Sequence, residues 1–373
     1  MTGGPDGPTS TTHGLAFPSC QGRWTLAAAV GVREPGGVDR PSTPQGPLAA
    51  QRPLPTWERV LPYAVRAPSS HNSQPWRFEL AADGRLLVHA DRSRALRVVD
   101  PDDRELVMSC GAALAHVGVA LRHFGHAGDV VVFPDPGEPD LLATVGLGRP
   151  HQPTTDDHRL LTAIESRQTH RAAFASNAVS SRTLTRLGRE AERFGVVMTI
   201  LTRPESAAVA DLVGQGDRLQ LGDRHFRREL AGWLRPNHTR RRDGMRGDSL
   251  GLGGLTSLLA PSIVARIDTG AGQARKDEAL ALAAPALVLL STPRDTPEDW
   301  LAAGEAVAMV LLRATVHGMA ASFLNQPIEV PTLRDRLRSL PGGDACPQLL
   351  LRVGYAPTGD RPASRRPVVD VLS

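Results

Sequence analysis

The amino-acid sequence repeats one pattern in its two halves, and this repeat limits the possible folds more than any other feature. When Gly111 is aligned with Gly304, Gly125 falls opposite Gly318. In both halves a segment of small and apolar residues predicts a helix that ends at the second glycine, where glycine suits a helix C-cap. An apolar strand is expected to follow each helix.

The flanking segments extend this correspondence. LLVHADR, which begins at Leu86, parallels LVLLSTP, and LLATVGLG, which begins at Leu141, parallels LLLRVGYA. Two unrelated helix–strand units can also match this loosely, so coincidence is the alternative to a duplication. A duplication would place two related lobes in one chain as a pseudo-dimer, which can reproduce the interfacial site of a symmetric dimer.

The hydrophobic pattern predicts a mixed α/β chain of the α+β class. We expect a helix over 105–123 and strands over 86–89, 129–133 and 141–146. Between the repeats, helices are predicted over 181–194 and 206–234, and a glycine-rich segment follows over 236–272. Because that segment shows no clear periodicity, it is expected to be a lid or a disordered linker.

These patterns divide the chain into three parts. Residues 1–52 are rich in Pro, Gly, Ser and Thr and are expected to form a disordered N-terminal arm. Residues 53–150 would form a first lobe that is incomplete. Residues 151–373 would form the second lobe, with the glycine-rich segment over 236–272 as its lid.

Composition favours a cytoplasmic protein that neither enters a membrane nor binds nucleic acid. Apolar residues make up 41% of the 373 residues, yet no window approaches the roughly 18 consecutive apolar residues of a membrane span. An apolar stretch over 24–32 has only one cation near its start, so export is the less favoured interpretation. The net charge is +4, but the arginine run over 240–242 has no interleaved aromatic residues.

Cysteine and histidine give no sign of a redox or metal centre. Three widely separated cysteines offer neither a C-x-x-C pair nor a disulfide framework. His123 and His126 lie on either side of Gly125 and have no third ligand nearby, so no metal site is expected.

Two segments in the first half of the chain offer groups for binding a ligand. The loop Ala67–Trp76 (APSSHNSQPW) carries hydroxyls, an imidazole and amides that suit the polar edge of a planar ligand, although an ordinary turn has a similar composition. The segment Ser166–Arg171 (SRQTHR) places two arginines four residues apart around a threonine. They can form charge-assisted bonds to one phosphate, or they can belong to an exposed basic turn.

Two more segments lie in the second half. Asn325–Glu329 (NQPIE) follows the strand that ends the second repeat, and a loop fixed by proline at the end of a buried strand can present backbone N–H groups to a cofactor. Ser364–Pro367 (SRRP) adds two arginines near the C-terminus, which alone indicate little.

Taken together and in this order, the four segments resemble the nitroreductase-family flavoproteins, and most closely the Acg-type branch, in which two lobes are fused. The resemblance covers about residues 55 to 372. It implies a nitroreductase-like fold that binds FMN. It also implies that the cofactor-binding residues are Ser69, His71, Asn72, Arg167, Gln168, Thr169, Arg171, Pro327, Ile328, Glu329 and Arg365.

The resemblance also implies the role of each group. The segment around Arg167 and Arg171 would bind the phosphate and ribityl chain, with Arg365 as a further phosphate contact. The loop around Asn72 would reach the flavin across the interface, and a backbone N–H near Ile328 and Glu329 would face flavin N5. No protein side chain is expected to be catalytic, since the flavin carries out the redox chemistry.

Two departures from the family pattern affect this interpretation. Gln168 stands where a second basic residue is common, and Phe174 lies one position later than in simpler members. The first lobe has no R-x-T-x-R segment of its own, so one FMN per chain is expected.

Three functions are consistent with these residues. The favoured one is an FMN-dependent oxidoreductase that transfers hydride from NAD(P)H to a nitroaromatic, a quinone or a specialised small molecule. The second is a protein that sequesters or stores FMN under a lid, with little reductase activity. The third is a partner-binding protein whose site has decayed. A monomer or a weak homodimer is expected.

Overall fold

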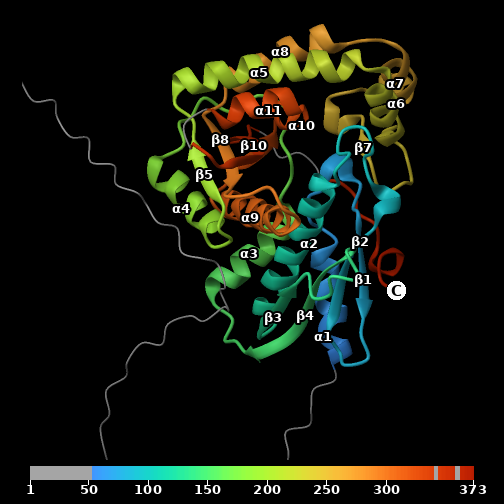
Figure 1. Cartoon of the computed structure of the whole chain (residues 1–373), viewed down its shortest axis with the longest axis vertical. Coiled ribbons are helices and arrows are strands. Elements are labelled where there is room, and N and C mark those ends of the chain that lie inside the picture. The colour runs from blue at the N-terminus through green and yellow to red at the C-terminus, as the bar shows by residue number, and fades with distance from the viewer. Residues whose placement is uncertain (1–52, 340–342, 358–361) are drawn as a thin grey trace, which may run out of the picture. The chain divides into compact units, whose positions relative to one another are not determined.

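The computed structural model describes residues 53–339, 343–357 and 362–373, and the arm predicted for residues 1–52 lies outside them. The first lobe contains α1 (Pro53–Ala64), β1 (Trp76–Leu80), β2 (Leu86–Ala90), α2 (Arg104–His123), β3 (His126–Val132) and β4 (Leu141–Pro150). Short 3-10 turns, η1 (Ser70–Asn72) and η2 (Arg92–Arg94), lie beside its strands. The helix α3 (Thr155–Ser166) leads to the second lobe (Figure 1).

The second lobe has the same kinds of elements and a long insertion. The lobe itself is built from α4 (Ser181–Glu192), β5 (Val197–Ile200), β8 (Ala286–Thr292), α9 (Pro297–Val316), β9 (Ala320–Phe323), α10 (Gln326–Glu329), α11 (Pro331–Arg338), β10 (Cys346–Gly354) and η4 (Val368–Asp370). The insertion between β5 and β8 holds α5 (Arg203–Gly222), α6 (Arg224–Trp233), β6 (Leu234–Arg235), β7 (Met245–Arg246), η3 (Asp248–Leu250), α7 (Gly254–Arg266) and α8 (Gly270–Leu282).

The two lobes share one sheet topology. The first sheet has the order β1-β2-β4-β3 and the second β5-β8-β10-β9, and all neighbouring strands are antiparallel. The orders coincide when β1, β2, β3 and β4 are matched with β5, β8, β9 and β10, as the sequence repeat requires. The structure therefore confirms two related lobes of mixed helix and sheet in one chain.

The matched glycines bring the central helices α2 and α9 together. A Cβ atom added to Gly111 would lie 2.1 Å from the carbonyl oxygen of Leu301, and one added to Gly304 would lie 2.0 Å from that of Met108. Met108 and Leu301 each precede their own glycine by three residues, so the two contacts are reciprocal. Close backbone approach of this kind requires glycine. The repeat therefore encodes the packing between the lobes.

The α2 helix is the centre of the larger core. It is long and apolar enough to cross a membrane, but 83% of its most apolar window is buried inside the protein. Its apolar side chains pack together with those of α1, the first sheet and part of α9. Helix α9 continues into a second core over the other sheet.

The insertion departs from the sequence-based expectations in two places. The single helix predicted over 206–234 is two helices, because Asp223 ends α5 and its carboxylate accepts a hydrogen bond from the amide of His225 at the start of α6 (2.8 Å). The segment over 236–272 contains β7, η3 and α7, so the expectation of a disordered linker was wrong. Helix α7 exposes Leu255 and Leu259, which lie one turn apart on the same face, so this apolar face does not pack into a core.

The lobes differ in one connection that bears on function. Between β3 and β4 the first lobe has only a loop over 133–140. The corresponding connection of the second lobe contains α10 and α11. The segment Asn325–Glu329 therefore has no counterpart in the first lobe.

Candidate functional site

The loop between α1 and β1 has an unusual backbone. His71, Asn72 and Gln74 all have φ between 51° and 54°, in the left-handed region that residues with a Cβ rarely adopt. The hydroxyl of Ser69 accepts a hydrogen bond from the Gln74 amide (3.0 Å) and helps to hold this conformation. Several such residues in one loop mark it as a candidate functional segment.

A buried carboxylate links this loop to α10. The Ser70 hydroxyl donates to Glu105 of α2 (2.5 Å), and the Asn325 side-chain amide donates to the other oxygen of Glu105 (3.3 Å). Two predicted segments, whose contacting residues Ser70 and Asn325 are 255 residues apart, therefore meet through one side chain that the sequence interpretation missed. The available signal was an acidic residue in the first turn of a mostly apolar helix.

A second carboxyl lies against the first. Glu329 forms a side-chain hydrogen bond with Glu105, and burial and the Glu105 charge raise the pKa of Glu329 well above its usual range. The side-chain amide of Gln220 in α5 also donates to Glu329 (2.5 Å). Burial lowers the pKa of His71 to about 4. The charge of Glu105 raises this pKa, and the charge of Arg171 lowers it. At neutral pH this end of the site thus holds a neutral imidazole and a protonated carboxyl.

The backbone amides predicted to face a flavin are already engaged. Ile328 and Glu329 both donate to the carbonyl of Asn325, at 2.7 and 2.9 Å, within the single turn of α10. Either amide would have to share or give up this bond to serve as a donor for a cofactor. The role expected for these two amides stays a prediction.

Arg167 is buried and has no counter-ion among the residues that the structure describes. Arg167 is the C-cap of α3, and its backbone amide donates to the carbonyl of Ala163. The residue is only 7% exposed. The Nε and one terminal nitrogen of the guanidinium are buried and have no hydrogen-bond partner. Burial lowers the pKa of Arg167 to about 10. A buried donor without an acceptor costs free energy, so this side chain fits an anionic ligand.

Arg167 shares its surroundings with other cations. Arg365 donates to the carbonyl of Ala67 (3.1 Å), and burial together with the charges of Arg167 and Arg66 lowers its pKa to about 9. Among the described residues, none of these three arginines forms an ion pair with a carboxylate. They line a cavity of about 440 Å³ together with Glu165, Ser364 and Arg366.

The segment after Arg167 is held against the second lobe. Thr169 pairs with Ala321 of β9. The guanidinium of Arg352 in β10 donates to the carbonyls of residues 170–172 at 3.3–3.5 Å and lies 5.0 Å from the ring centre of Phe174. The segment therefore runs from Arg167 at the cavity to Arg171, whose charge acts on His71.

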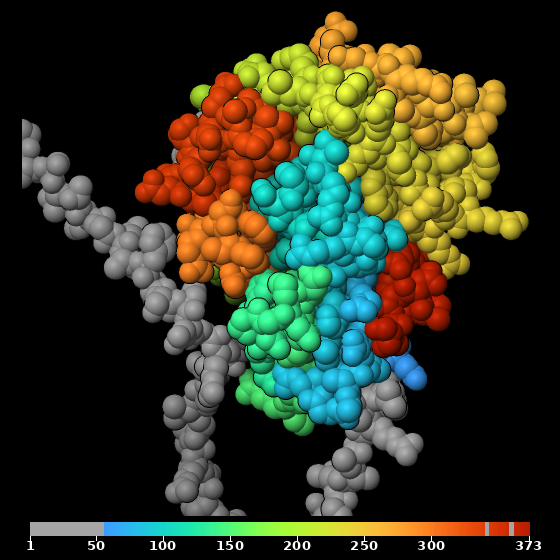
Figure 2. All heavy atoms as spheres, turned by 45° about the vertical axis from the view of Figure 1, so that its right-hand side comes forward, coloured from blue at the N-terminus to red at the C-terminus, as the bar shows by residue number. Residues whose placement is uncertain are grey.

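The insertion is attached to the loop that contains Asn72. The Gly244 amide donates to the Asn72 carbonyl (3.2 Å), and the Asn72 side chain donates to the Gly244 carbonyl (3.0 Å). Asn72 also donates to the carbonyl of Ser364 (3.2 Å), and Gln74 donates to that of Arg242 (2.9 Å). Figure 2 shows the same arrangement, with the C-terminal segment in red between the first lobe and the yellow insertion.

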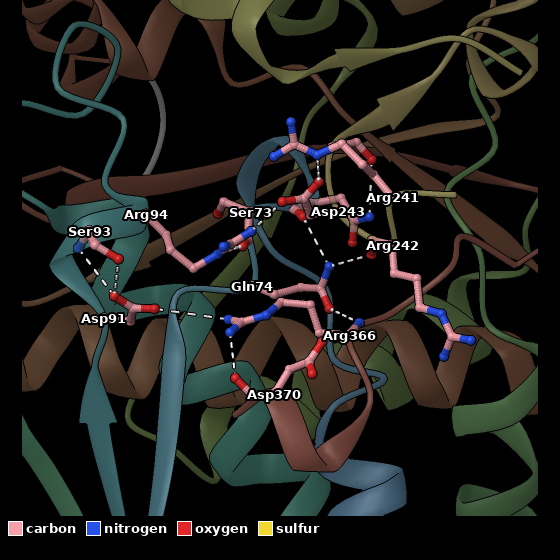
Figure 3. A network of polar contacts seen from close by, with 12 residues as sticks. Ser73, Gln74, Asp91, Ser93, Arg94, Arg241, Arg242, Asp243, Arg366 and Asp370 are labelled. Atoms are coloured by element: carbon pink, nitrogen blue, oxygen red, sulfur yellow. Dashed lines mark hydrogen bonds and ion pairs between the residues drawn. The ribbon is translucent and has the colours of Figure 1, made fainter. Parts of the chain in front are cut away.

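Asp243 is the charged centre of this attachment (Figure 3). It accepts hydrogen bonds from Arg94 (2.7 Å) and from Arg235 (3.2 Å), which come from the first lobe and the insertion respectively. Burial would raise the pKa of Asp243, but the bond from Arg94 and the charges of Arg235 and Arg241 lower it overall. Asp243 was not identified from the sequence, because its partners are distant along the chain.

The structure thus brings the four predicted segments into one region. The loop around Asn72 contacts the C-terminal segment directly and reaches α10 through Glu105, while Arg171 lies near His71. Arg167 and Arg365 lie at the cavity, at the other end of the Arg167–Arg171 segment.

Comparisons with known proteins give the family. No family model matches the chain. The protein acg of Mycobacterium tuberculosis strain ATCC 25618 / H37Rv, provisionally named an NAD(P)H nitroreductase, is 34% identical over 323 residues, which cover 83% of this chain and 92% of acg. A second protein of that strain with the same provisional enzyme name is 34% identical over 331 residues, covering 87% and 92%.

A solved structure has also been matched. The FMN and NADPH-dependent nitroreductase NfnB from Sphigopyxis sp. strain HMH is 24% identical and covers 57% of this chain and 97% of its own, with a TM-score of 0.38. The family assignment depends on the two M. tuberculosis relatives, whose identity extends over most of both chains. The chain therefore belongs to the nitroreductase family, in the Acg-type branch.

Proposed function

We propose that this protein is an FMN-dependent oxidoreductase that transfers hydride from NAD(P)H to a small-molecule acceptor such as a nitroaromatic or a quinone. The observation that carries the proposal is Arg167, a buried guanidinium without a partner beside a cavity lined by further arginines. Membership of the nitroreductase family and the names of the M. tuberculosis relatives support the activity.

The cavity residues fit a terminal phosphate. A phosphate monoester carries close to two negative charges at neutral pH and three strong acceptor oxygens. Arg167 and Arg365 would bind it, and both lack a carboxylate partner among the described residues. The single phosphate favours FMN over FAD.

The other predicted residues would hold the rest of the cofactor. Gln168, Thr169 and Arg171 would follow the ribityl chain, since this segment leads from the cavity toward His71. Ser69, His71 and Asn72 would face the ring from the first lobe. Pro327, Ile328 and Glu329 would face it from the second. When bound, FMN would supply hydride acceptance and donation, so the protein needs no nucleophile of its own.

The two lobes would act as the two subunits of a fused dimer, with residues 53–150 and 151–373 as the lobes. Only the second lobe has α10 and the segment around Arg167, and only the first has the Asn72 loop. These halves complement one another and would form one site per chain. The protein would then work in the cytoplasm as a monomer or a weak homodimer.

A rapid-mixing experiment tests the activity. The purified protein is expected to be yellow and to release FMN on denaturation. Mixing it with NADPH without oxygen should bleach the flavin absorbance within one turnover, and adding a quinone should restore it. A colourless protein that cannot be reconstituted with FMN would refute cofactor binding. A yellow protein that NADPH and NADH do not bleach would refute the reductase function alone.

The same experiment distinguishes reductase activity from a second possible function, the storage of FMN under a lid. The paired hydrogen bonds between Gly244 and Asn72 favour this alternative, because they attach the insertion to the loop proposed to face the flavin. A lid held there would keep a nicotinamide from stacking on the ring. Storage predicts tight FMN binding without bleaching by NAD(P)H.

A further inference from the structure

Helix α7 carries its large apolar side chains on the side that faces solvent. Its buried positions are the small residues Ser257 and Ala260, and the helix packs against α6 and β6. The opposite side of the helix, here called the α7 face, consists of the exposed residues Leu255, Leu258, Leu259 and Ile263. Leu255 is 82% exposed and Leu259 is 56% exposed. A helix on the surface of a globular protein normally turns its apolar side inward, so the α7 face lacks the partner that its composition calls for.

The part of the insertion around α7 is strongly basic. Residues 224–282, from α6 to α8, contain 11 Lys and Arg and six Asp and Glu, so their net charge of +5 exceeds the +4 of the whole chain. Helix α7 itself has no acidic residue. Its last residue, Arg266, is exposed and lies two turns beyond Leu259 and three turns beyond Leu255, on the same side of the helix. An apolar helix face with cations around it is complementary to an anionic lipid surface.

The size of the α7 face distinguishes a membrane from a second copy of the chain. The helix has 13 residues. It is therefore about 20 Å long and roughly 10 Å wide, so that one side covers on the order of 200 Å². A specific protein interface needs about 800 Å² from each partner, whereas an interfacial helix needs only its one apolar side to bind a bilayer. Figure 1 shows α7 beside α6 and away from the two four-stranded sheets.

We propose that the insertion docks this protein on an anionic lipid bilayer, with the α7 face buried in the headgroup layer and Arg266 beside the lipid phosphates. The helix lies on the surface and does not span the bilayer. Apolar burial and charge attraction act together, which is the combination that reversible membrane binding requires. The proposal goes beyond the proposed function and does not depend on it.

Flotation of lipid vesicles measures the docking with the full-length protein. Vesicles of phosphatidylcholine containing about 30% phosphatidylglycerol, an anionic lipid, are compared with vesicles of phosphatidylcholine alone at roughly 0.15 M salt. We expect the protein to float with the anionic vesicles and to bind the neutral vesicles at least about tenfold less. Binding to the anionic vesicles should decrease in about 1 M salt, where charges are screened over about 3 Å.

A matched pair of double variants assigns the apolar contribution to α7. Replacing Leu255 and Leu259 by Gln keeps good helix formers but removes the two most exposed apolar side chains of the α7 face. Partition into anionic vesicles should then fall at least about tenfold. The control replaces Leu282 and Val369, which are 61% and 79% exposed and lie outside α7, by Gln. The control should bind like the wild type.

A second pair of variants tests the charge. Arg266→Gln should lower binding to the anionic vesicles about fivefold and leave binding to neutral vesicles unchanged, since one cation near the surface is lost. Arg149→Gln, at an exposed position of β4, removes the same charge far from α7 along the chain and should have no effect.

The possible failures can be told apart. A wild-type protein that does not float with anionic vesicles overturns the inference. Unchanged flotation of the α7 double variant also overturns it and assigns the lipid contact to another segment, such as the apolar stretch over 24–32. A wild-type dimer that does not float, and that dissociates in the double variant, would make the α7 face a subunit interface. If the double variant does not fold, the comparison of Arg266→Gln with Arg149→Gln decides. None of these results depends on bound FMN, so each leaves the proposed function intact.

Discussion

At the scale of single residues, the proposed site depends on buried arginine side chains that have no carboxylate partner among the described residues. Many arginines in the described part of the chain, such as Arg313 with Asp156 and Arg334 with Asp295, form ion pairs with carboxylates. Arg167 does not, although it is among the most buried. Burying this cation costs desolvation free energy. A bound ligand with negative charge would compensate for that cost.

Replacement of Arg167 by Ala should therefore weaken FMN binding by about 1.5–3 kcal/mol, the range for a hydrogen bond to a charged group. Binding is measured by flavin fluorescence quenching. Arg149→Ala, at an exposed position on β4, should leave the affinity unchanged. Equal losses in both variants would indicate a general effect of net charge and would remove Arg167 from the site.

At the scale of elements, the crossing of α2 and α9 joins the two lobes. A methyl group at Gly111 would collide with the backbone of α9, where no side chain can move aside. Gly111→Ala should destabilise the protein by roughly 1–3 kcal/mol or more, as overpacking does. Gly118→Ala in the same helix has no atom within 4 Å of the added carbon and should be neutral or stabilise by up to about 1 kcal/mol. Urea unfolding of both variants tests this difference.

The part of the insertion around Asp243 is attached to the first lobe through charges, whereas α5 and α6 pack through apolar side chains, so the Asp243 segment should be the easier part to release. Asp243→Asn removes the charge that pairs with Arg94 and Arg235. We expect trypsin to cleave the arginine run over 240–242 faster in this variant and NADPH to reduce the flavin faster. Asp248→Asn, which weakens an exposed pair with Arg246 and can keep the bond from the Ser249 amide, is the control. Unchanged cleavage in Asp243→Asn would show that the backbone bonds of Gly244 are sufficient.

At the scale of the whole molecule, buried acids should make stability depend on pH. Burial raises the pKa of Glu305 in α9 to about 8, from an unfolded value near 4.5. The folded state then binds a proton that the unfolded state has lost, so the stabilising contribution is complete below pH 4.5 and is lost as pH rises to 8. Asp217, with a pKa of about 7, acts in the same direction.

We therefore expect the melting temperature to fall between pH 5 and pH 8.5, and part of this fall should be absent in Glu305→Gln. At pH 8.5 the variant should melt above the wild type, because no buried acid has to ionise at this position. The exposed Glu58→Gln should follow the wild-type curve. A variant curve parallel to that of the wild type would show that Glu305 does not titrate in this range.

Stoichiometry also belongs to the whole molecule. Because the Asn72 loop and the Arg167 segment each occur in one lobe only, reconstitution with excess FMN should saturate at one flavin per chain even if the protein self-associates. Flavin and protein absorbance after gel filtration give the ratio. A reproducible ratio near two would reveal a second site in the first lobe.

The sequence by itself determined the elements and the repeat. The glycines at 111, 125, 304 and 318 identified the central helices and their ends, because glycine permits close backbone approach and adopts a positive φ more readily than any other residue. Local patterns also placed the strands of the first lobe within a few residues. They could not locate the break at Asp223, since one capping side chain determines it, or helix α7, which carries Gly254 and Pro261 and leaves its leucines exposed.

Only the tertiary structure decided which groups are paired. Arg167 and Arg241 are both arginines within basic segments, and no local pattern separates them. The structure buries one without a partner and leaves the other exposed beside Asp243. Asp243 was missed for the same reason, because Arg94 and Arg235 approach it only in the folded chain. Burial and charge pairing depend on contacts between segments far apart in the chain, whereas sequence patterns report on neighbours within a few turns.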